Sequence, residues 1–181
     1  DLNNVFFDAE DGSALTFTIA GNSNPSLVNA VVDADSALDF IFTANASGAA
    51  EIVIRATDLE ALFVEDTLVV TVTAVNDTPI VAIAVPDTTI DEDAVINAYR
   101  DLNDVFADIE DGNNLAFSIE NNSNPTLLNA VINADSALDL SCAPNLSGSA
   151  TLVIRATDAG GLFVEDTLVV TVTAVNDTPI V

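Results

Sequence analysis

The sequence contains very few positive charges and no histidine. Its 181 residues include 29 aspartates and glutamates but only three basic side chains, Arg55, Arg100 and Arg155, so the formal net charge is −26. Nucleic acids and anionic membrane surfaces bind proteins through clusters of basic side chains, so neither is an expected partner. The lack of histidine also removes the most common general base and the usual ligand of transition metals. Histidine-based catalysis and histidine-ligated metal sites are therefore excluded.

Cysteine, large aromatic side chains and long apolar runs are also scarce. Cys142 is the only cysteine, so we interpret it as a small core residue rather than a nucleophile or half of a disulfide. There is no tryptophan and Tyr99 is the only tyrosine, whereas carbohydrate sites usually rely on exposed aromatic platforms. No apolar run approaches the ~18 residues of a membrane-spanning helix, so membrane insertion is not expected.

What the sequence does contain is a tandem repeat with a period of 100 residues. The stretch 1–12 returns with few changes as 101–112, and the stretch 63–81 returns unchanged as 163–181. Solenoid repeats are only about 20–50 residues long, so a unit of this length is a whole domain copied in tandem. Copying a domain adds length or further binding sites, and it does not by itself create catalysis.

The two copies are not equally complete. Residues 78–177 form one complete unit, residues 1–77 have no counterpart of 78–100, and residues 178–181 match the start of a further unit. We expect the missing segment to come from the preceding linker of a continuous array, because residues 178–181 are too few to replace it. The alternative is a filament in which a neighbouring protomer supplies the segment.

Apolar and polar residues alternate with a period of two along much of the chain, which predicts β-strands. Residues 15–19, 52–56 and 68–72 show this alternation, and residues 80–85 form an apolar stretch that predicts an opening strand of the second copy. No segment has the capped apolar stripe of a helix. About seven short strands per 100 residues predict an all-β fold of tandem immunoglobulin-like β-sandwiches, with the first copy lacking its N-terminal strand.

The acidic residues of the complete unit are grouped rather than evenly spread. The groups are Asp91-Glu92-Asp93, Asp108-x-Glu110-Asp111, Asp158 and Asn176-Asp177. In an immunoglobulin-type sandwich the loops at 108–112 and at 158 share the end where the chain enters, so residues 76 and 77 arrive there as well. Three groups of oxygen ligands are therefore predicted to meet at one end of the domain.

Meeting carboxylates suggest a bound cation. Two charges 4 Å apart repel by about 1 kcal/mol in water and about 4 kcal/mol near a protein surface. Calcium removes this repulsion and prefers six to eight oxygen ligands, including asparagine and backbone carbonyls. Two alternatives remain: the groups are solvated turn residues, or the acidity is an adaptation to high salt without specific ions. We favour calcium as the cofactor because the acids are clustered.

The junction Asn76-Asp77-Thr78-Pro79 resembles the Asn-Asp-x-Pro junction of bacterial cadherin-like repeats, including the dystroglycan-type group, and the acidic motifs follow in the order found there. The resemblance implies cadherin-like sandwiches that bind calcium between repeats. At the central junction it implies the ligands Asn76, Asp77, Asp108, Glu110, Asp111 and Asp158. At the next junction it implies Asp91, Glu92 and Asp93. The copies of these motifs add Asp8, Glu10, Asp11, Asp58, Asn176 and Asp177 as candidate ligands.

The favoured function is a calcium-stiffened structural repeat of an extracellular or cell-surface adhesin stalk or filament. Its partners would be neighbouring repeats of the chain or protomers of the same filament. The alternative is an adhesin module that binds a glycan or another cell-surface ligand. An enzyme with paired carboxylates is not expected, because every candidate acid lies in a turn present in both copies.

Overall fold

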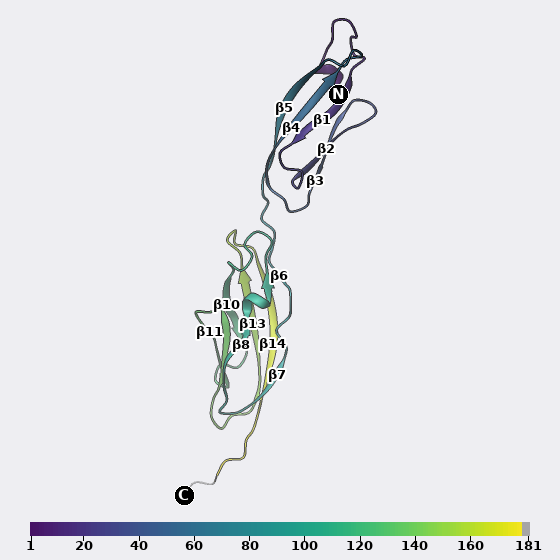
Figure 1. Ribbon diagram of the computed structural model, residues 1–181. Helices are drawn as coiled ribbons and strands as arrows, with labels where there is room; N and C mark the ends of the chain where they lie inside the picture. Colours follow the sequence, from purple (N-terminus) through teal and green to yellow (C-terminus); the bar gives the residue numbers. More distant parts are fainter. Residues whose placement is uncertain (179–181) are drawn as a thin grey trace. The chain divides into compact units, whose positions relative to one another are not determined.

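The computed structural model describes residues 1–178, which form β-strands joined by turns (Figure 1). The chain divides into two compact units, Asp1–Val75 and Asn76–Val181, and each has a hydrophobic core of its own. The predicted all-β fold is therefore confirmed. The repeat limits 1–77, 78–177 and 178–181 stay a prediction, and residues 179–181 lie outside the described part.

The first unit contains five strands and one short 3-10 helix. The elements are η1 (Leu2–Asn4), β1 (Thr16–Asn22), β2 (Val28–Val32), β3 (Leu38–Phe42), β4 (Gly48–Thr57) and β5 (Phe63–Val72). β4 lies between β1 and β5 in one antiparallel sheet, and β2 pairs with β3 in a second sheet. Alternate side chains such as Ile52 and Ile54 point into the core, as the period of two predicts.

The described residues of the second unit contain nine strands and a matching 3-10 helix. The elements are β6 (Ile80–Val81), β7 (Thr88–Asp91), β8 (Val95–Asp101), η2 (Leu102–Asp104), β9 (Phe106–Ala107), β10 (Ala116–Asn122), β11 (Leu128–Ile132), β12 (Ala137–Cys142), β13 (Gly148–Thr157) and β14 (Phe163–Thr173). Its sheets have the orders β10-β13-β14-β7, β11-β12-β8 and β6-β9. Across residues 1–178, no helix is long and apolar enough to cross a membrane.

The duplicated sequence folds into duplicated local structure. β1 pairs with β4 in the register in which β10 pairs with β13, and both pairs contain an irregularity after the matching isoleucine, Ile19 or Ile119. β4 with β5 and β13 with β14 also share one register over ten residue pairs. Local pairing is thus the same in both units.

The segment 78–100 of the second unit adds an edge strand to two of its three sheets. β7 pairs in parallel with β14, and β8 pairs in antiparallel with β12. In the described residues of the first unit, β5 and β3 have no strand at these positions. The described residues of the first unit therefore contain no counterparts of β6, β7 and β8.

The predicted opening strand at 80–85 is shorter than expected. β6 ends at Val81, and the Val85 N–H donates to the side chain of Asp166 over 2.6 Å instead of joining a ladder. Pro86 follows and has no N–H to offer a neighbouring strand. The segment therefore breaks and resumes as β7 after the proline, which the apolar pattern alone did not predict.

Candidate functional site

The linker that enters the second unit is held by two acidic loops. The Asn76 side-chain Nδ2 donates to Asp158 Oδ2 over 2.8 Å, and the Asp77 N–H donates to Glu110 Oε2 over 3.1 Å. The loops are also joined to each other, since the N–H after Asp158 donates to Asp111 Oδ2 over 2.7 Å. The structure thus brings these residues to one end of the second unit.

Asp108 organises its own loop and leaves one oxygen unused. Its Oδ1 accepts hydrogen bonds from the N–H groups of Glu110 and Asp111, over 2.9 and 2.8 Å. Gly112 follows with a φ of 57°, a conformation that favours glycine. Among residues 1–178, no protein group donates to the buried Oδ2 of Asp108. A buried carboxylate oxygen without a donor is costly, and a cation would relieve that cost.

Asp158 is the most buried of these acids, with 6% of its surface exposed. Its burial favours the neutral acid, but hydrogen bonds from the Asn76 amide and from the Leu162, Gly161 and Gly160 N–H groups outweigh that effect and lower its pKa. The charged form is therefore favoured. A negative charge is thus maintained beside the linker.

Gly160 is required for the approach of the linker. A Cβ built on this residue would lie 2.6 Å from the Asn76 Nδ2, closer than atoms pack. The first unit has Glu60 at the matching position. Our reading of the sequence missed this residue, although the change from Leu59-Glu60-Ala61 to Ala159-Gly160-Gly161 between nearly identical copies was a visible signal.

The first unit has the same acidic loops. Asp8 Oδ1 accepts from the N–H groups of Glu10 and Asp11 over 2.9 and 2.8 Å. Asp11 Oδ2 accepts from the Leu59 N–H over 3.1 Å, and Asp58 Oδ1 accepts from the Leu62 N–H over 2.8 Å. The loops therefore take this shape from their own backbone hydrogen bonds, without a linker beside them.

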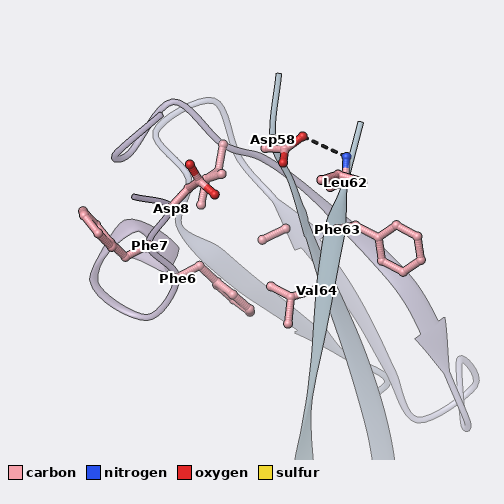
Figure 2. Close-up of a pocket in the computed structure, with 9 residues that line it drawn as sticks. Phe6, Phe7, Asp8, Asp58, Leu62, Phe63 and Val64 are labelled. Atoms are coloured by element: carbon pink, nitrogen blue, oxygen red, sulfur yellow. Dashed lines mark hydrogen bonds between the residues drawn. The ribbon is translucent and has the colours of Figure 1, made fainter. Parts of the chain in front are cut away.

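Beside these loops the first unit has an apolar hollow with a volume of about 420 Å³. Figure 2 shows Phe6 and Val64 facing each other, with Asp8 and Asp58 on the acidic side. Leu15 and Ala56 also line the hollow.

The remaining predicted residues lie at the other end of β14. Asp158 precedes β14. Val175 follows β14, and its N–H donates to Glu92 Oε1 over 2.8 Å. Asp91 Oδ1 accepts from the Thr173 hydroxyl over 2.6 Å, and Asp93 forms the adjacent turn with a φ of 66°. Asn176 and Asp177 continue the chain from there.

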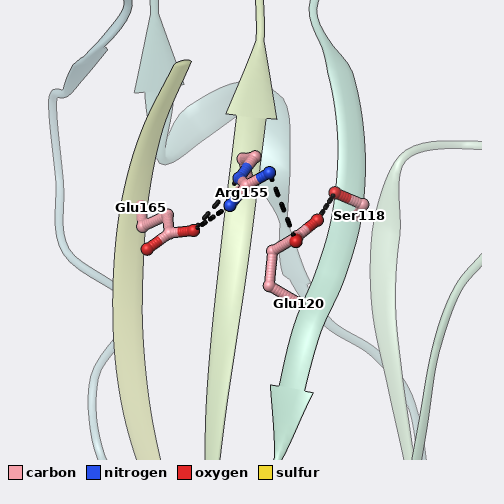
Figure 3. A network of polar contacts seen from close by, with 4 residues as sticks. All are labelled: Ser118, Glu120, Arg155 and Glu165. Atoms are coloured by element: carbon pink, nitrogen blue, oxygen red, sulfur yellow. Dashed lines mark hydrogen bonds and ion pairs between the residues drawn. The ribbon is translucent and has the colours of Figure 1, made fainter.

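Two of the three arginines form ion pairs across strands. Figure 3 shows Arg155 between Glu165 and Glu120, with nitrogen–oxygen distances of 2.6 and 3.3 Å. Arg55 makes the matching 2.6 Å pair with Glu65 in the first unit. These cations are thus already paired with carboxylates, so they do not form a basic surface for an anionic partner.

The acidic groups do not form a finished metal centre. Within residues 1–178, no three aspartate, glutamate or cysteine side chains are arranged to hold a metal ion. The oxygen atoms are of the type that calcium prefers, and Asp108 offers a buried one without a donor. The roles of all these residues as calcium ligands stay a prediction.

Both units thus share one sandwich architecture, and in the second unit the entering linker is bound at one end. A family model described as "Bacterial Ig domain" matches residues 76–173, more than half of the chain. The chain belongs to the bacterial Ig domain family. This membership and the cadherin structures below confirm the predicted resemblance to bacterial cadherin-like repeats. None of the curated proteins matches the sequence.

Solved cadherin repeats share the fold of this bacterial Ig domain chain. Protocadherin gamma B7 extracellular cadherin domains 1–4 match with a TM-score of 0.56 at 17% identity, over 90% of this chain and 42% of that one. Mouse cadherin-23 EC22–24 matches with a TM-score of 0.55 at 16% identity, over 94% of this chain and 57% of that one. Human mucin-like protocadherin EC1–2 matches with a TM-score of 0.53 at 14% identity, over 90% of this chain and 85% of that one. The chain thus spans less than half of the first structure, and at these identities the likeness concerns the fold alone.

Proposed function

We propose that the chain is a structural repeat of an extracellular or cell-surface adhesin stalk or filament, stiffened by calcium at the linker end of each unit. The observation that carries the proposal is the pair of hydrogen bonds from the linker, Asn76 to Asp158 and Asp77 to Glu110. They hold the entering chain against the acidic loops. A domain of this kind works by its position in a chain of domains, not by turnover of a substrate.

The donor set fits calcium after one local change. The Asn76 amide now points its Nδ2 at Asp158. A half-turn of that amide would present Oδ1 instead, and two oxygens would then face each other as they do around a cation. The buried Asp108 Oδ2 needs no change of partner. Glu110 and Asp111 would complete the set, with backbone carbonyls and water.

Calcium would supply a positive charge that none of the candidate ligands supplies. The acidic side chains would provide the negative charge that attracts the ion, and the bound ion would fix the linker. Because Asp77 and Asn76 belong to the linker and the other ligands belong to the loops, binding would restrict how the linker leaves the unit. Repeated at every junction, this restriction would turn flexibly joined domains into a rod.

The same logic assigns the other predicted residues to neighbouring junctions. Asp8, Glu10, Asp11 and Asp58 would serve the linker that enters the first unit. Asp91, Glu92 and Asp93 would serve the opposite end of the second unit, near Asn176 and Asp177. The partners of the chain in this proposal are repeats like itself.

Calorimetric melting with millimolar calcium and with chelator tests the proposal. A ligand that binds only the folded state at a hundredfold excess over its Kd stabilises by about 2.7 kcal/mol. We expect such a gain for the second unit, and we expect Asp108→Asn to reduce it. Asp135→Asn is the matched control, because Asp135 is an exposed acid in the turn between β11 and β12.

The high-salt alternative gives a different result. If calcium and chelator melts superimpose at moderate ionic strength, and sodium chloride alone raises the melting temperature, the calcium proposal is wrong. Magnesium at the same concentration separates a specific site from general screening, because magnesium gives up its water reluctantly.

A further inference from the structure

We propose that the seam between residues 85–92 and 166–175 bears tensile load in the second unit, and that Asp87, Glu92 and Asp166 are the positioning residues that lengthen it. The seam is defined as the set of hydrogen bonds and apolar contacts that join these two segments. The proposal rests on the proposed function in one respect, because a stalk or filament has to transmit tension along its chain. It needs no ion, so its test is separate from the calcium test.

The strand pairing within the seam is short. β7 pairs in parallel with β14 over four residue pairs, from Thr88 with Val170 to Asp91 with Thr173. The other neighbour of β14, β13, pairs with it over ten residue pairs. Strand pairing alone would therefore hold β14 to β7 much more weakly than to β13.

Two aspartates lengthen the seam around Pro86, which interrupts the opening segment and has no N–H. Before the proline, the Val85 N–H donates to Asp166 Oδ2 over 2.6 Å. After it, Asp87 Oδ1 accepts from the Val169 N–H over 2.8 Å. Hydrogen bonds to a charged acceptor are shorter and roughly twice as strong as neutral ones. The aspartates thus replace the strand pairing where the proline breaks it.

A buried glutamate lengthens the seam at its other end. The Glu92 N–H donates to the Thr173 carbonyl over 2.9 Å, and Glu92 Oε1 accepts from the Val175 N–H over 2.8 Å. Asp91 Oδ1 accepts from the Thr173 hydroxyl over 2.6 Å. Only 7% of Glu92 is exposed, so water competes little for its hydrogen bond. The contacts therefore extend beyond both ends of the four-pair ladder.

Apolar side chains fix the seam to the core. Val85 and Ile90 are 3% and 8% exposed, and both pack in the cluster that contains Val170 and Val172. A shift of the opening segment along β14 would pull these side chains out of the core while it breaks the hydrogen bonds. The two costs would arise together, which makes the seam resist sliding.

The direction of the strands decides how tension acts on the seam. The chain enters the second unit at Asn76, before β7, and leaves it through Val175, after β14. Because β7 and β14 are parallel, a pull on both ends draws β7 towards its N-terminus and β14 towards its C-terminus. This pull acts along the strands, whereas the hydrogen bonds run from strand to strand. All the bonds are therefore strained together, and they do not open one after another.

Force measurements on the full 181-residue chain in chelator test the proposal. Handles fused to both ends hold the chain at constant force, and the lifetime of the folded second unit is recorded. The two units differ in length, so their unfolding steps differ in size. Forced unfolding is governed by the unfolding rate. Asp166→Ala should shorten the lifetime about tenfold or more, because a hydrogen bond to a charged group is lost.

Three further variants separate load bearing from simple stabilisation. Asp166→Asn should restore most of the lifetime, because the amide keeps an oxygen acceptor for the Val85 N–H. Asp87→Ala changes an exposed side chain, so the unit should still fold, and its lifetime should fall several-fold. Ser123→Ala is the matched control, since Ser123 Oγ accepts from the Thr151 N–H over 2.8 Å outside the seam. It should lower the equilibrium stability but change the lifetime under force less than about twofold.

Three results would overturn the proposal. If Ser123→Ala shortens the lifetime as much as the seam variants do, the seam stabilises the fold without bearing load. If neither Asp166→Ala nor Asp87→Ala shortens it, the carboxylates carry no tension. If residues 76–92 detach in a small early step before the main one, the seam yields first. Calcium melts decide the proposed function separately, because a calcium-dependent gain can be present or absent whichever way the seam behaves.

Discussion

The same apolar side chains are buried in the second unit and partly exposed in the first. Leu168 and Val170 on β14 are both 0% exposed, whereas Leu68 and Val70 on β5 are only partly buried. β5 and β14 nevertheless pair with β4 and β13 in one register. Local sequence and strand pairing are therefore not enough to complete a core.

The difference arises from the segment 78–100. β7 extends the sheet beside β14, β8 covers the edge of β12, and the N–H groups of residues 82 and 83 donate to the carbonyl of Val105. Val105 is 0% exposed with this cover, and Val5 is 63% exposed without it. Complete burial of one such side chain contributes about 1.5–3 kcal/mol. One short segment thus decides how much apolar surface each unit buries.

The largest expected effect is that the two units unfold separately. With several apolar side chains uncovered, the first unit should be less stable by on the order of 3–5 kcal/mol and should melt more than about 10 °C below the second. Calorimetry of the full chain should resolve two transitions. Adding residues 76–100 ahead of Asp1 should move the lower transition towards the upper one, and an unchanged lower transition would contradict this explanation.

A matched pair of core substitutions sharpens the comparison. Leu168→Ala should destabilise the second unit by about 2–5 kcal/mol, because it leaves a cavity in a closed core. Leu68→Ala should destabilise the first unit by roughly half as much, since its side chain is partly solvated already. Denaturant unfolding of each transition measures both values. Equal losses would mean that the two cores are equally closed in solution.

A smaller effect is expected where the linker meets the loops. Gly160→Ala places a Cβ against Asn76 and should displace its hydrogen bond to Asp158, at a cost of about 1 kcal/mol. The φ of Gly160 lies outside the left-handed region, so an alanine there adds no backbone strain to the measured effect. Ala159→Gly is a control beside it that leaves the asparagine untouched. Backbone amide shifts of Asn76 and Asp77 report the displacement.

The smallest effect concerns acid stability. Asp158 has a folded pKa below its ordinary 3.8, so its contribution to stability is complete above about pH 4 and is lost as pH falls through the folded pKa. The hydrogen bond from Asn76 is one cause, so Asn76→Ala should reduce this loss. The test compares the unfolding free energy of the second unit in both proteins between pH 5 and 2.5. If both proteins lose the same unfolding free energy as the pH falls, the hydrogen bond from Asn76 does not lower the pKa of Asp158.

Much of the architecture follows from patterns that act over a few residues. Alternation of apolar and polar side chains places one face of each strand in a core, so residues such as Ile52 and Ile54 indicate strands without further information. The acidic loops are equally local, because Asp8 and Asp108 accept hydrogen bonds from the N–H groups two and three residues further along the chain. The repeat of the sequence also predicted two domains of one kind.

The parts that the sequence did not reveal depend on contacts between distant segments. The parallel pairing of β7 with β14 joins residues about 80 positions apart, and no local pattern distinguishes it from an antiparallel pairing. The approach of Asn76 to Gly160 and the hollow beside Phe6 are likewise products of packing. Period-two alternation indicates which face of a strand is apolar. Only the tertiary structure decides what covers that side, because burial depends on which other segment reaches it.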